Sequence, residues 1–155
     1  MERIYIKDLN NFVSKEVLIA GWVDVRRDQG KMIFLDFRDM TGKVQGVILP
    51  NYIETLEVGK TLRNEFVVKV KGKVNKRPER NIKEGILNGD IELEILEIEV
   101  LAEAAPLPFD ISLSGYNLEL TTELDNRALV LRQPKVQAVF KVTETIIDSF
   151  REFMK

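Results

Sequence analysis

The chain has 155 residues, of which 45% are hydrophobic and 31% are charged, a composition typical of one globular domain with some additional length. It contains no cysteine and no histidine, which excludes disulfides, thiolate nucleophiles, histidine acid–base catalysis and zinc sites built from Cys or His. The net charge of −2 argues against bulk electrostatic binding of nucleic acid, so any such contact must be local.

No segment predicts contact with a membrane. The first residues lack the basic start and apolar run of a secretory signal, and no stretch approaches the roughly 20 apolar residues of a membrane span. Because the absence of cysteine suits a reducing compartment, we expect a cytoplasmic protein.

Most of the first 103 residues predict short strands, because apolar and β-branched residues recur at every second position between turn signals. The predicted strands cover residues 17–27, 32–38, 43–49, 66–76 and 91–100. Residues 8–14 predict one helical turn, and residues 52–62 carry a weak helical pattern. A change of apolar phase at Ile95 and Leu96 predicts a β-bulge. Five strands with a helix between the third and fourth predict an all-β OB-fold, a small Greek-key barrel.

The remainder of the chain breaks the strand pattern. Pro106, Pro108 and Gly115 indicate a linker or hinge over residues 104–130, after a barrel domain at residues 1–103. Pro134 then opens a long amphipathic helix within residues 131–155, and its apolar stripe needs a packing partner. Since the chain ends inside this helix without a Gly or Asn cap, we expect it to be a fragment of a longer protein.

The hairpin of residues 32–49 carries the first candidate binding feature. Alternate side chains of its first strand form the apolar face, namely Ile33, Leu35 and Phe37. Phe34 therefore lies on the polar face, and if Arg38 pairs with Lys43, Gln45 lies opposite Asp36 and diagonal to Phe34. An exposed ring beside an amide can stack on a single-stranded base while polar groups read the base edges. The alternative is that a loop or helix of the same domain covers Phe34.

Charged residues near the hairpin could extend this feature. Arg27 and Arg77 follow predicted strands and could contact phosphate or stack on a base, although exposed arginines often serve only solubility. Glu92 could accept hydrogen bonds from a base edge such as that of guanine. Three other glutamates of the same strand compete for this role, namely Glu94, Glu97 and Glu99.

The charge distribution is uneven. Residues 60–80 are mainly basic, whereas residues 83–103 carry a single lysine, Lys83, among acidic residues. This distribution also fits opposite charges that pair on adjacent strands. There is no convincing catalytic carboxylate pair, no phosphate-binding glycine loop and no metal-ligand set, so we expect this chain alone to be inactive and to hold no cofactor.

Several motifs resemble, in order, the N-terminal anticodon-binding domain of aspartyl-tRNA synthetases. They lie at residues 21–23, 26–28, 33–36, 38–39, 42, 45, 62–66, 77, 81, 89–93 and 107–109. Residues 124–140 are similar to the entry of that family into its first catalytic helix, so we expect residues 131–155 to begin a truncated catalytic domain. Residues 26–28 and 63–66 favour the aspartyl branch over the asparaginyl and lysyl enzymes, which share the fold and a central uridine in their anticodons.

The resemblance implies roles for individual residues. Phe34 would stack on the central uridine of the anticodon, Gln45 would hydrogen-bond to that base, and Glu92 would contact the first anticodon base. The remaining bases and backbone would be held by Arg27, Arg77 and Asn81. Full-length members are homodimeric ligases that use ATP and magnesium to attach aspartate to tRNA-Asp, with dimerisation and catalysis in the domain absent here.

Some positions depart from the family pattern. Lys31 stands where many relatives have glycine, and Gln29 occupies a position that helps decide whether tRNA-Asn is also accepted. We therefore expect Gln29 and Lys31 to modulate specificity. Two alternatives remain, a stand-alone OB module that binds single strands or a protein partner, and the same domain of an asparaginyl or lysyl enzyme.

Overall fold

The computed structural model describes residues 2–109 and 118–155. The chain forms two compact units, Met1–Ala105 and Pro106–Lys155. Residues 110–117, in the middle of the predicted linker, lie outside the described residues. Within the described ranges, no helix is both long enough and apolar enough to cross a membrane.

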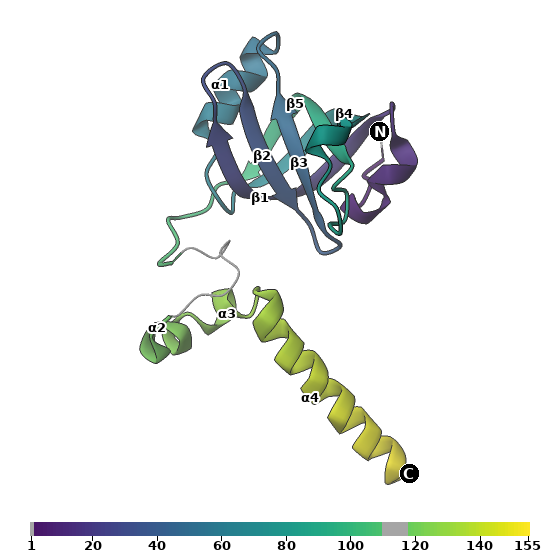
Figure 1. The fold of residues 1–155 in the computed structure, drawn as a ribbon. Helices are drawn as coiled ribbons and strands as arrows, with labels where there is room; N and C mark the ends of the chain where they lie inside the picture. Colours follow the sequence, from purple (N-terminus) through teal and green to yellow (C-terminus); the bar gives the residue numbers. More distant parts are fainter. Residues whose placement is uncertain (1, 110–117) are drawn as a thin grey trace. The chain divides into compact units, whose positions relative to one another are not determined.

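The first unit is a closed β-barrel (Figure 1). Its strands are β1 (Glu16–Asp28), β2 (Ile33–Arg38), β3 (Lys43–Ile48), β4 (Val67–Lys76) and β5 (Ile91–Ala102). They follow one another around the barrel in the order β1-β2-β3-β5-β4, and β4 closes it by pairing antiparallel with β1. The only parallel pairing among these strands is between β3 and β5. This topology confirms the predicted five-stranded OB-fold.

The barrel core follows the period-two pattern of the sequence. On β2 the alternate side chains of Ile33, Leu35 and Phe37 are buried, as predicted. On β4 the buried alternate positions are Val68, Val70, Gly72 and Val74. Burial of these apolar side chains is the main favourable contribution to folding of the barrel.

Two helical segments close the ends of the barrel. The 3-10 helix η1 (Ile6–Phe12) buries Ile6 and Leu9, and it forms where one helical turn was predicted. Helix α1 (Ile53–Thr61) lies between β3 and β4, which confirms the predicted helix. It packs closely because Gly59 has no side chain: a Cβ atom there would lie 2.5 Å from Cδ1 of Ile48.

The strand pairing shifts register at three places, one of them between Val67 and Val68 at the start of β4. Gly72 pairs with Ile95 while Lys71 pairs with Glu97, so Leu96 is the extra residue, and this confirms the predicted bulge. The hydroxyl of Thr55 in α1 donates to the carbonyl oxygen of Leu96 at 2.7 Å, which attaches the helix to this bulge.

A further bulge lies in β1 at Asp24. Val23 pairs with Phe37 and Val25 pairs with Asp36, which leaves Asp24 as the extra residue. The sequence did not predict this bulge, because Val23 and Val25 continue the apolar alternation through it.

In the described residues of the second unit, the secondary structure consists of helices. Pro134 is at the start of α4 (Pro134–Phe153), as predicted, and most of the apolar stripe of this helix is exposed. Two short helices, α2 (Leu120–Asp125) and α3 (Arg127–Val130), form within the range predicted as linker. The scattered polar residues of that range gave no helical periodicity.

Candidate nucleic-acid interface

The outer face of the barrel collects the predicted base-reading residues. Arg38 pairs with Lys43 and Asp36 pairs with Gln45, which confirms the register expected from the sequence. The neighbouring pair joins Phe34 on β2 to Val47 on β3. Because successive strand residues point to opposite sides, Phe34 and Gln45 both lie outside the barrel, on adjacent strands.

Strand β5 continues this face. Gly46 of β3 pairs with Leu93 of β5, so Gln45 and Glu92 are neighbours on the outer side. Phe34 is diagonal to Gln45 across β2 and β3, and adjacent strands lie about 4.8 Å apart, so the three side chains are close together on the outer side. We call the surface formed by Phe34, Gln45 and Glu92 the base face.

Glu92 differs from the glutamates that competed with it in the sequence. Lys71 pairs with Glu97 at 3.4 Å, and Lys69 pairs with Glu99 at 3.0 Å. Among the residues that the structure describes, the Glu92 carboxylate has no hydrogen bond or ion pair. The pairing of opposite charges on adjacent strands is thus confirmed for β4 and β5, and it leaves Glu92 available.

Glu94 is also engaged within the protein. The Tyr52 hydroxyl donates to Glu94 Oε1 at 3.0 Å, and Asn75 Nδ2 donates to Oε2 at 2.8 Å. The hydrogen bond to Glu94, together with desolvation and the nearby negative charge, raises the pKa of Tyr52. Glu94 therefore lies two positions along β5 from Glu92, on the same outer side and beside Val47, and both of its carboxylate oxygens already accept hydrogen bonds.

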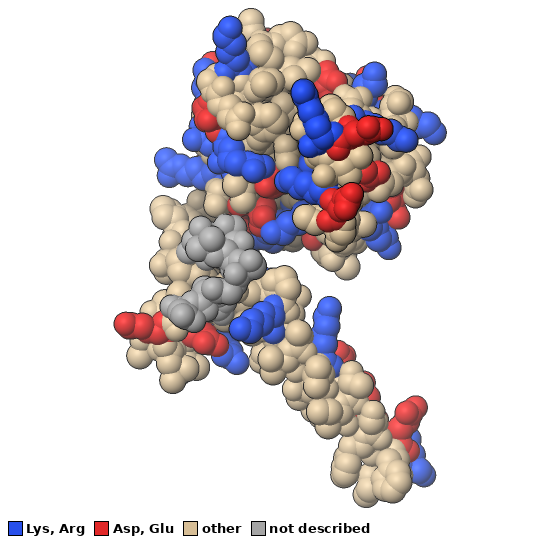
Figure 2. Space-filling view, viewed as in Figure 1, with Lys and Arg blue, Asp and Glu red and all other residues tan. Residues whose placement is uncertain are grey.

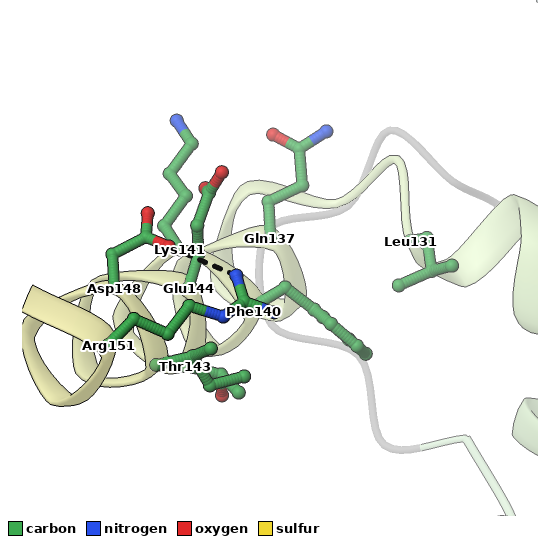
Figure 3. Close-up of a pocket in the computed structure, with 9 residues that line it drawn as sticks. Leu131, Gln137, Phe140, Lys141, Thr143, Glu144, Asp148 and Arg151 are labelled. Carbon is green, nitrogen blue, oxygen red and sulfur yellow. Dashed lines mark hydrogen bonds and ion pairs between the residues drawn. The ribbon is translucent and has the colours of Figure 1, made fainter. Parts of the chain in front are cut away.

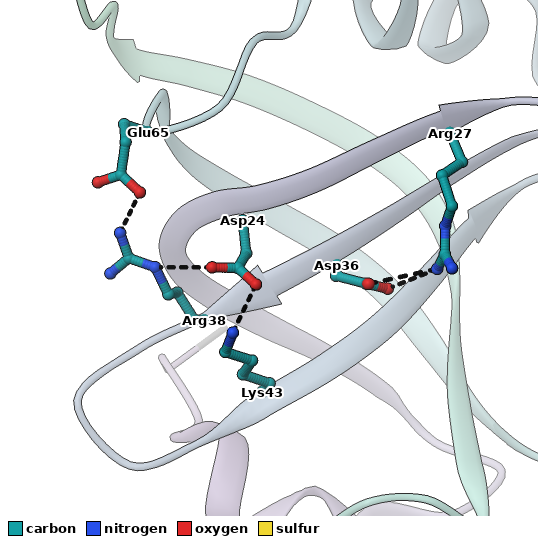
Figure 4. Close-up of polar contacts among 6 residues, drawn as sticks. All are labelled: Asp24, Arg27, Asp36, Arg38, Lys43 and Glu65. Carbon is teal, nitrogen blue, oxygen red and sulfur yellow. Dashed lines mark hydrogen bonds and ion pairs between the residues drawn. The ribbon is translucent and has the colours of Figure 1, made fainter. Parts of the chain in front are cut away.

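Phe34 is partly exposed on the base face, between its neighbours on β1 and β3. Arg27 of β1 pairs with Phe34 in the strand register. The Arg27 guanidinium donates from Nη2 to Asp36 at 3.0 and 3.2 Å (Figure 4). A cationic group is thus held beside an accessible aromatic ring, a combination suited to a stacked base and its phosphate.

The β4–β5 loop brings a second arginine to the base face. Arg77 is buried, with 8% of its surface exposed, and its Nη2 donates to Gln45 Oε1 at 3.3 Å. Its Nε is buried and has no hydrogen-bond partner among the described residues. Asn81 ends the short 3-10 helix η2 (Glu79–Asn81) of the same loop, and its side chain is exposed.

Two further residues of this loop contribute, although nothing in the sequence pattern singled them out as site residues. Lys83 donates from Nζ to the same Gln45 oxygen at 3.3 Å. The buried side chain of Asn88 donates from Nδ2 to the carbonyl oxygens of Ile6 and Lys43, at 2.9 and 3.3 Å. The one signal in the sequence that could have identified Lys83 is that it is an isolated lysine within an acidic stretch.

The β1–β2 loop carries the predicted specificity residues. Gln29 and Lys31 are both exposed there. Gly30 adopts a φ of 74° and donates its N–H to Asp28 Oδ1 at 3.0 Å, which shapes the turn between them. In OB-folds the β1–β2 and β4–β5 loops border the face that binds oligonucleotides, so all eight predicted residues lie on that face or on its bordering loops.

A network of ion pairs supports the hairpin at its other end (Figure 4). The buried Asp24 accepts from Arg38 Nε at 3.1 Å and from Lys43 Nζ at 2.6 Å. Arg38 also pairs with the buried Glu65, and its guanidinium lies 5.3 Å from the centre of the Trp22 ring. The β1 bulge turns Asp24 toward these partners, so it has a structural role beneath the interface.

The surface charges of the barrel are mixed. In Figure 2, Lys and Arg side chains alternate with Asp and Glu over the face in view, where β2 and β3 are in front. Because positive and negative side chains are mixed, this distribution favours recognition of nucleic acid by a few local side chains. It does not favour binding through a broad cationic surface.

A depression away from the base face follows α4 (Figure 3). It has a volume of about 570 Å³ and is lined by residues of α4 together with Leu131. None of the predicted site residues lines it. No group of three or more potential His, Cys, Asp or Glu metal ligands occurs in the part of the chain that the structure describes.

Comparison with known proteins agrees with a nucleic-acid-binding role for the base face. Residues 17–101 match the tRNA anticodon family model, described as an OB-fold nucleic acid binding domain. The chain therefore belongs to this family of anticodon-binding OB-fold domains, and nearly all of it is similar to the corresponding part of aspartate–tRNA ligases. The stand-alone module proposed as an alternative is less well supported, because aminoacyl-tRNA ligases match this chain over nearly its whole length.

Three relatives illustrate this similarity. The aspartate–tRNA ligase of Listeria welshimeri is 40% identical over 149 residues, which are 95% of this chain and 25% of that protein. The asparaginyl-tRNA synthetase of Pyrococcus horikoshii, solved with asparaginyl-adenylate, is 33% identical with a TM-score of 0.74, over 99% of this chain and 34% of that chain. The aspartyl-tRNA synthetase of Entamoeba histolytica, at 23% identity and a TM-score of 0.84 over 99% and 37%, supports the fold. The chain spans about a quarter of the length of the curated relatives it matches.

Proposed function

We propose that this chain recognises the anticodon of tRNA-Asp, as part of an aspartate–tRNA ligase that acts in the cytoplasm. The whole ligase would attach aspartate to tRNA with ATP and Mg²⁺ and would act as a homodimer. ATP and Mg²⁺ would serve the catalytic part of that ligase, as the resemblance implies. The similarity to an asparaginyl-tRNA synthetase supports a test of whether tRNA-Asn is accepted as well.

The observation that carries the proposal is the composition of the base face. A partly exposed ring, a side-chain amide and a carboxylate without a partner among the described residues lie on three adjacent strands, at Phe34, Gln45 and Glu92. Aromatic stacking holds a single-stranded base without regard to its identity, and the polar groups then read its edges. Glu92 would accept from the N1 and N2 donors of a guanine in the first anticodon position.

The bordering groups complete the proposed site. Arg27 and Arg77 would neutralise phosphates or stack on the outer bases, and Asn81 would hydrogen-bond to the third base. Gln29 and Lys31 lie on the loop that would face the same end of the anticodon, where they would modulate the choice between tRNA-Asp and tRNA-Asn.

The test is binding of the 155-residue chain to an anticodon stem-loop with the sequence GUC, with Phe34 altered. Phe34→Ala should weaken binding by about 1–3 kcal/mol, the contribution of one stacked base. Phe34→Leu retains apolar bulk without an aromatic face and serves as the packing control. Comparable weakening by both variants supports stacking, whereas unchanged affinity in either variant contradicts the role of Phe34.

A further inference from the structure

The amide of Gln45 receives hydrogen bonds from two cationic side chains. Arg77 Nη2 and Lys83 Nζ each lie 3.3 Å from Gln45 Oε1. Arginine and lysine can only donate hydrogen bonds, so an amide nitrogen at this position would meet two donors without an acceptor. The contacts therefore fix which end of the amide faces the loop, and that end is the oxygen.

The opposite end of the amide is left for a ligand. Among the described residues, Gln45 Nε2 makes no hydrogen bond. Gln45 is partly exposed on the base face, one strand away from Phe34 and from Glu92. An amide free to rotate could offer either a donor or an acceptor, but this one offers its N–H groups.

The loop that carries Lys83 is held in place by contacts away from the base face. The Lys83 N–H donates to the carbonyl oxygen of Gly89 at 3.1 Å, and the Gly89 N–H donates to that of Ile86 at 2.9 Å. The backbone approaches so closely here that a Cβ on Gly89 would lie 2.0 Å from the Lys83 carbonyl oxygen. The buried Asn88 then attaches the loop to η1 and to the start of β3.

We infer that Lys83 is a positioning residue that, together with Arg77, sets the polarity of Gln45 so that the domain selects a base presenting an acceptor. Uracil presents its O4 acceptor where cytosine presents its N4 amino donor. An amide held with its N–H groups outward can therefore bond to uracil and meets a second donor on cytosine. This inference rests on the proposed function, in which Gln45 faces the central anticodon base.

The first experiment compares two stem-loops that differ only in uracil or cytosine at the central position, at fixed salt. The variants are Lys83→Met, which removes the donor and the charge, and Lys83→Arg, which retains a cationic donor. Lys76→Met is the matched control, because Lys76 is an exposed lysine at the end of β4 and removal of its charge leaves Gln45 untouched. Lys83→Met should reduce the ratio of uracil to cytosine affinity by about threefold to tenfold, and Lys83→Arg should restore it.

The control separates this effect from a general loss of charge. Lys76→Met should weaken binding to both loops equally and leave their ratio unchanged. If Lys83→Met also weakens both loops equally, Lys83 contacts phosphate only and the inference is overturned. If the unaltered chain itself shows no preference for uracil, the proposed function fails, and this outcome is separate from the behaviour of the variants.

A second measurement needs no RNA. The side-chain amide resonances of Gln45 in the free chain should shift on Lys83→Met and remain in place on Lys76→Met, because only the first variant removes a donor to the amide oxygen. Unshifted Gln45 resonances in the Lys83 variant would show that the contact does not hold the amide, and would contradict the inference.

Discussion

Arg27 donates from one guanidinium nitrogen to both carboxylate oxygens of Asp36, at 3.0 and 3.2 Å, across the strands that flank the β1–β2 loop. The side chains are 45% and 24% exposed, and an ion pair this accessible contributes at most about 1 kcal/mol to stability. The main effect of the ion pair is on position, because it holds the Arg27 guanidinium beside Phe34 on the base face.

Arg27→Gln should accordingly separate binding from folding. We expect the free energy of unfolding to change by less than about 1 kcal/mol, while affinity for the anticodon stem-loop falls. Urea denaturation and an RNA titration of the same samples check both. Asp36→Asn retains the cation and should weaken binding less than Arg27→Gln; the reverse order would contradict the role assigned to Arg27.

Asp24 should behave in the opposite way. Its buried carboxylate accepts from Arg38 and Lys43, and Asp24→Ala would leave the partly buried guanidinium with fewer acceptors. We expect the free energy of unfolding to fall by about 1–3 kcal/mol in urea denaturation. Lys69→Met, which breaks the exposed pair with Glu99, should change it by less than about 1 kcal/mol. Equal effects in the two variants would show that the Asp24 network adds nothing to an ordinary surface pair.

The contact between Tyr52 and Glu94 predicts a pH effect. The hydrogen bond to Glu94 raises the pKa of Tyr52 in the folded chain, so folding favours the protonated phenol. This contribution to stability is fully present below the ordinary tyrosine pKa of about 10 and is lost as pH rises through the higher folded value. In an NMR titration of the tyrosine rings, Glu94→Gln should return the Tyr52 pKa toward its ordinary value. A Tyr52 midpoint unaffected by Glu94→Gln would contradict this cause.

Much of the barrel could be predicted from local patterns. Alternation on β2 and β4 identified the buried faces, and the phase change at Leu96 identified its bulge. The outer positions of Phe34 and Gln45 followed from the same periodicity once the turn fixed the register. These features depend on neighbours in sequence or on one hairpin, which a single sequence can show.

The remaining features depend on contacts between distant segments. Nothing near Asn88 indicates that its amide binds Ile6 and Lys43, and without that attachment the position of Lys83 could not be inferred. Glu92 could not be separated from Glu94 by pattern, because its availability depends on Tyr52 and Asn75 engaging its neighbour. The roles of the anticodon-reading residues came from the family resemblance, and they stay predictions.

The most direct test of anticodon recognition is the choice that the unaltered chain makes between RNA loops. The 155-residue chain should bind a GUC anticodon stem-loop more tightly than loops with a scrambled anticodon or with the third base exchanged, at one fixed salt concentration. Each mismatched base should weaken binding by about 1–3 kcal/mol, by analogy with base readout elsewhere. Equal affinity for the GUC and scrambled loops would contradict anticodon recognition by this chain.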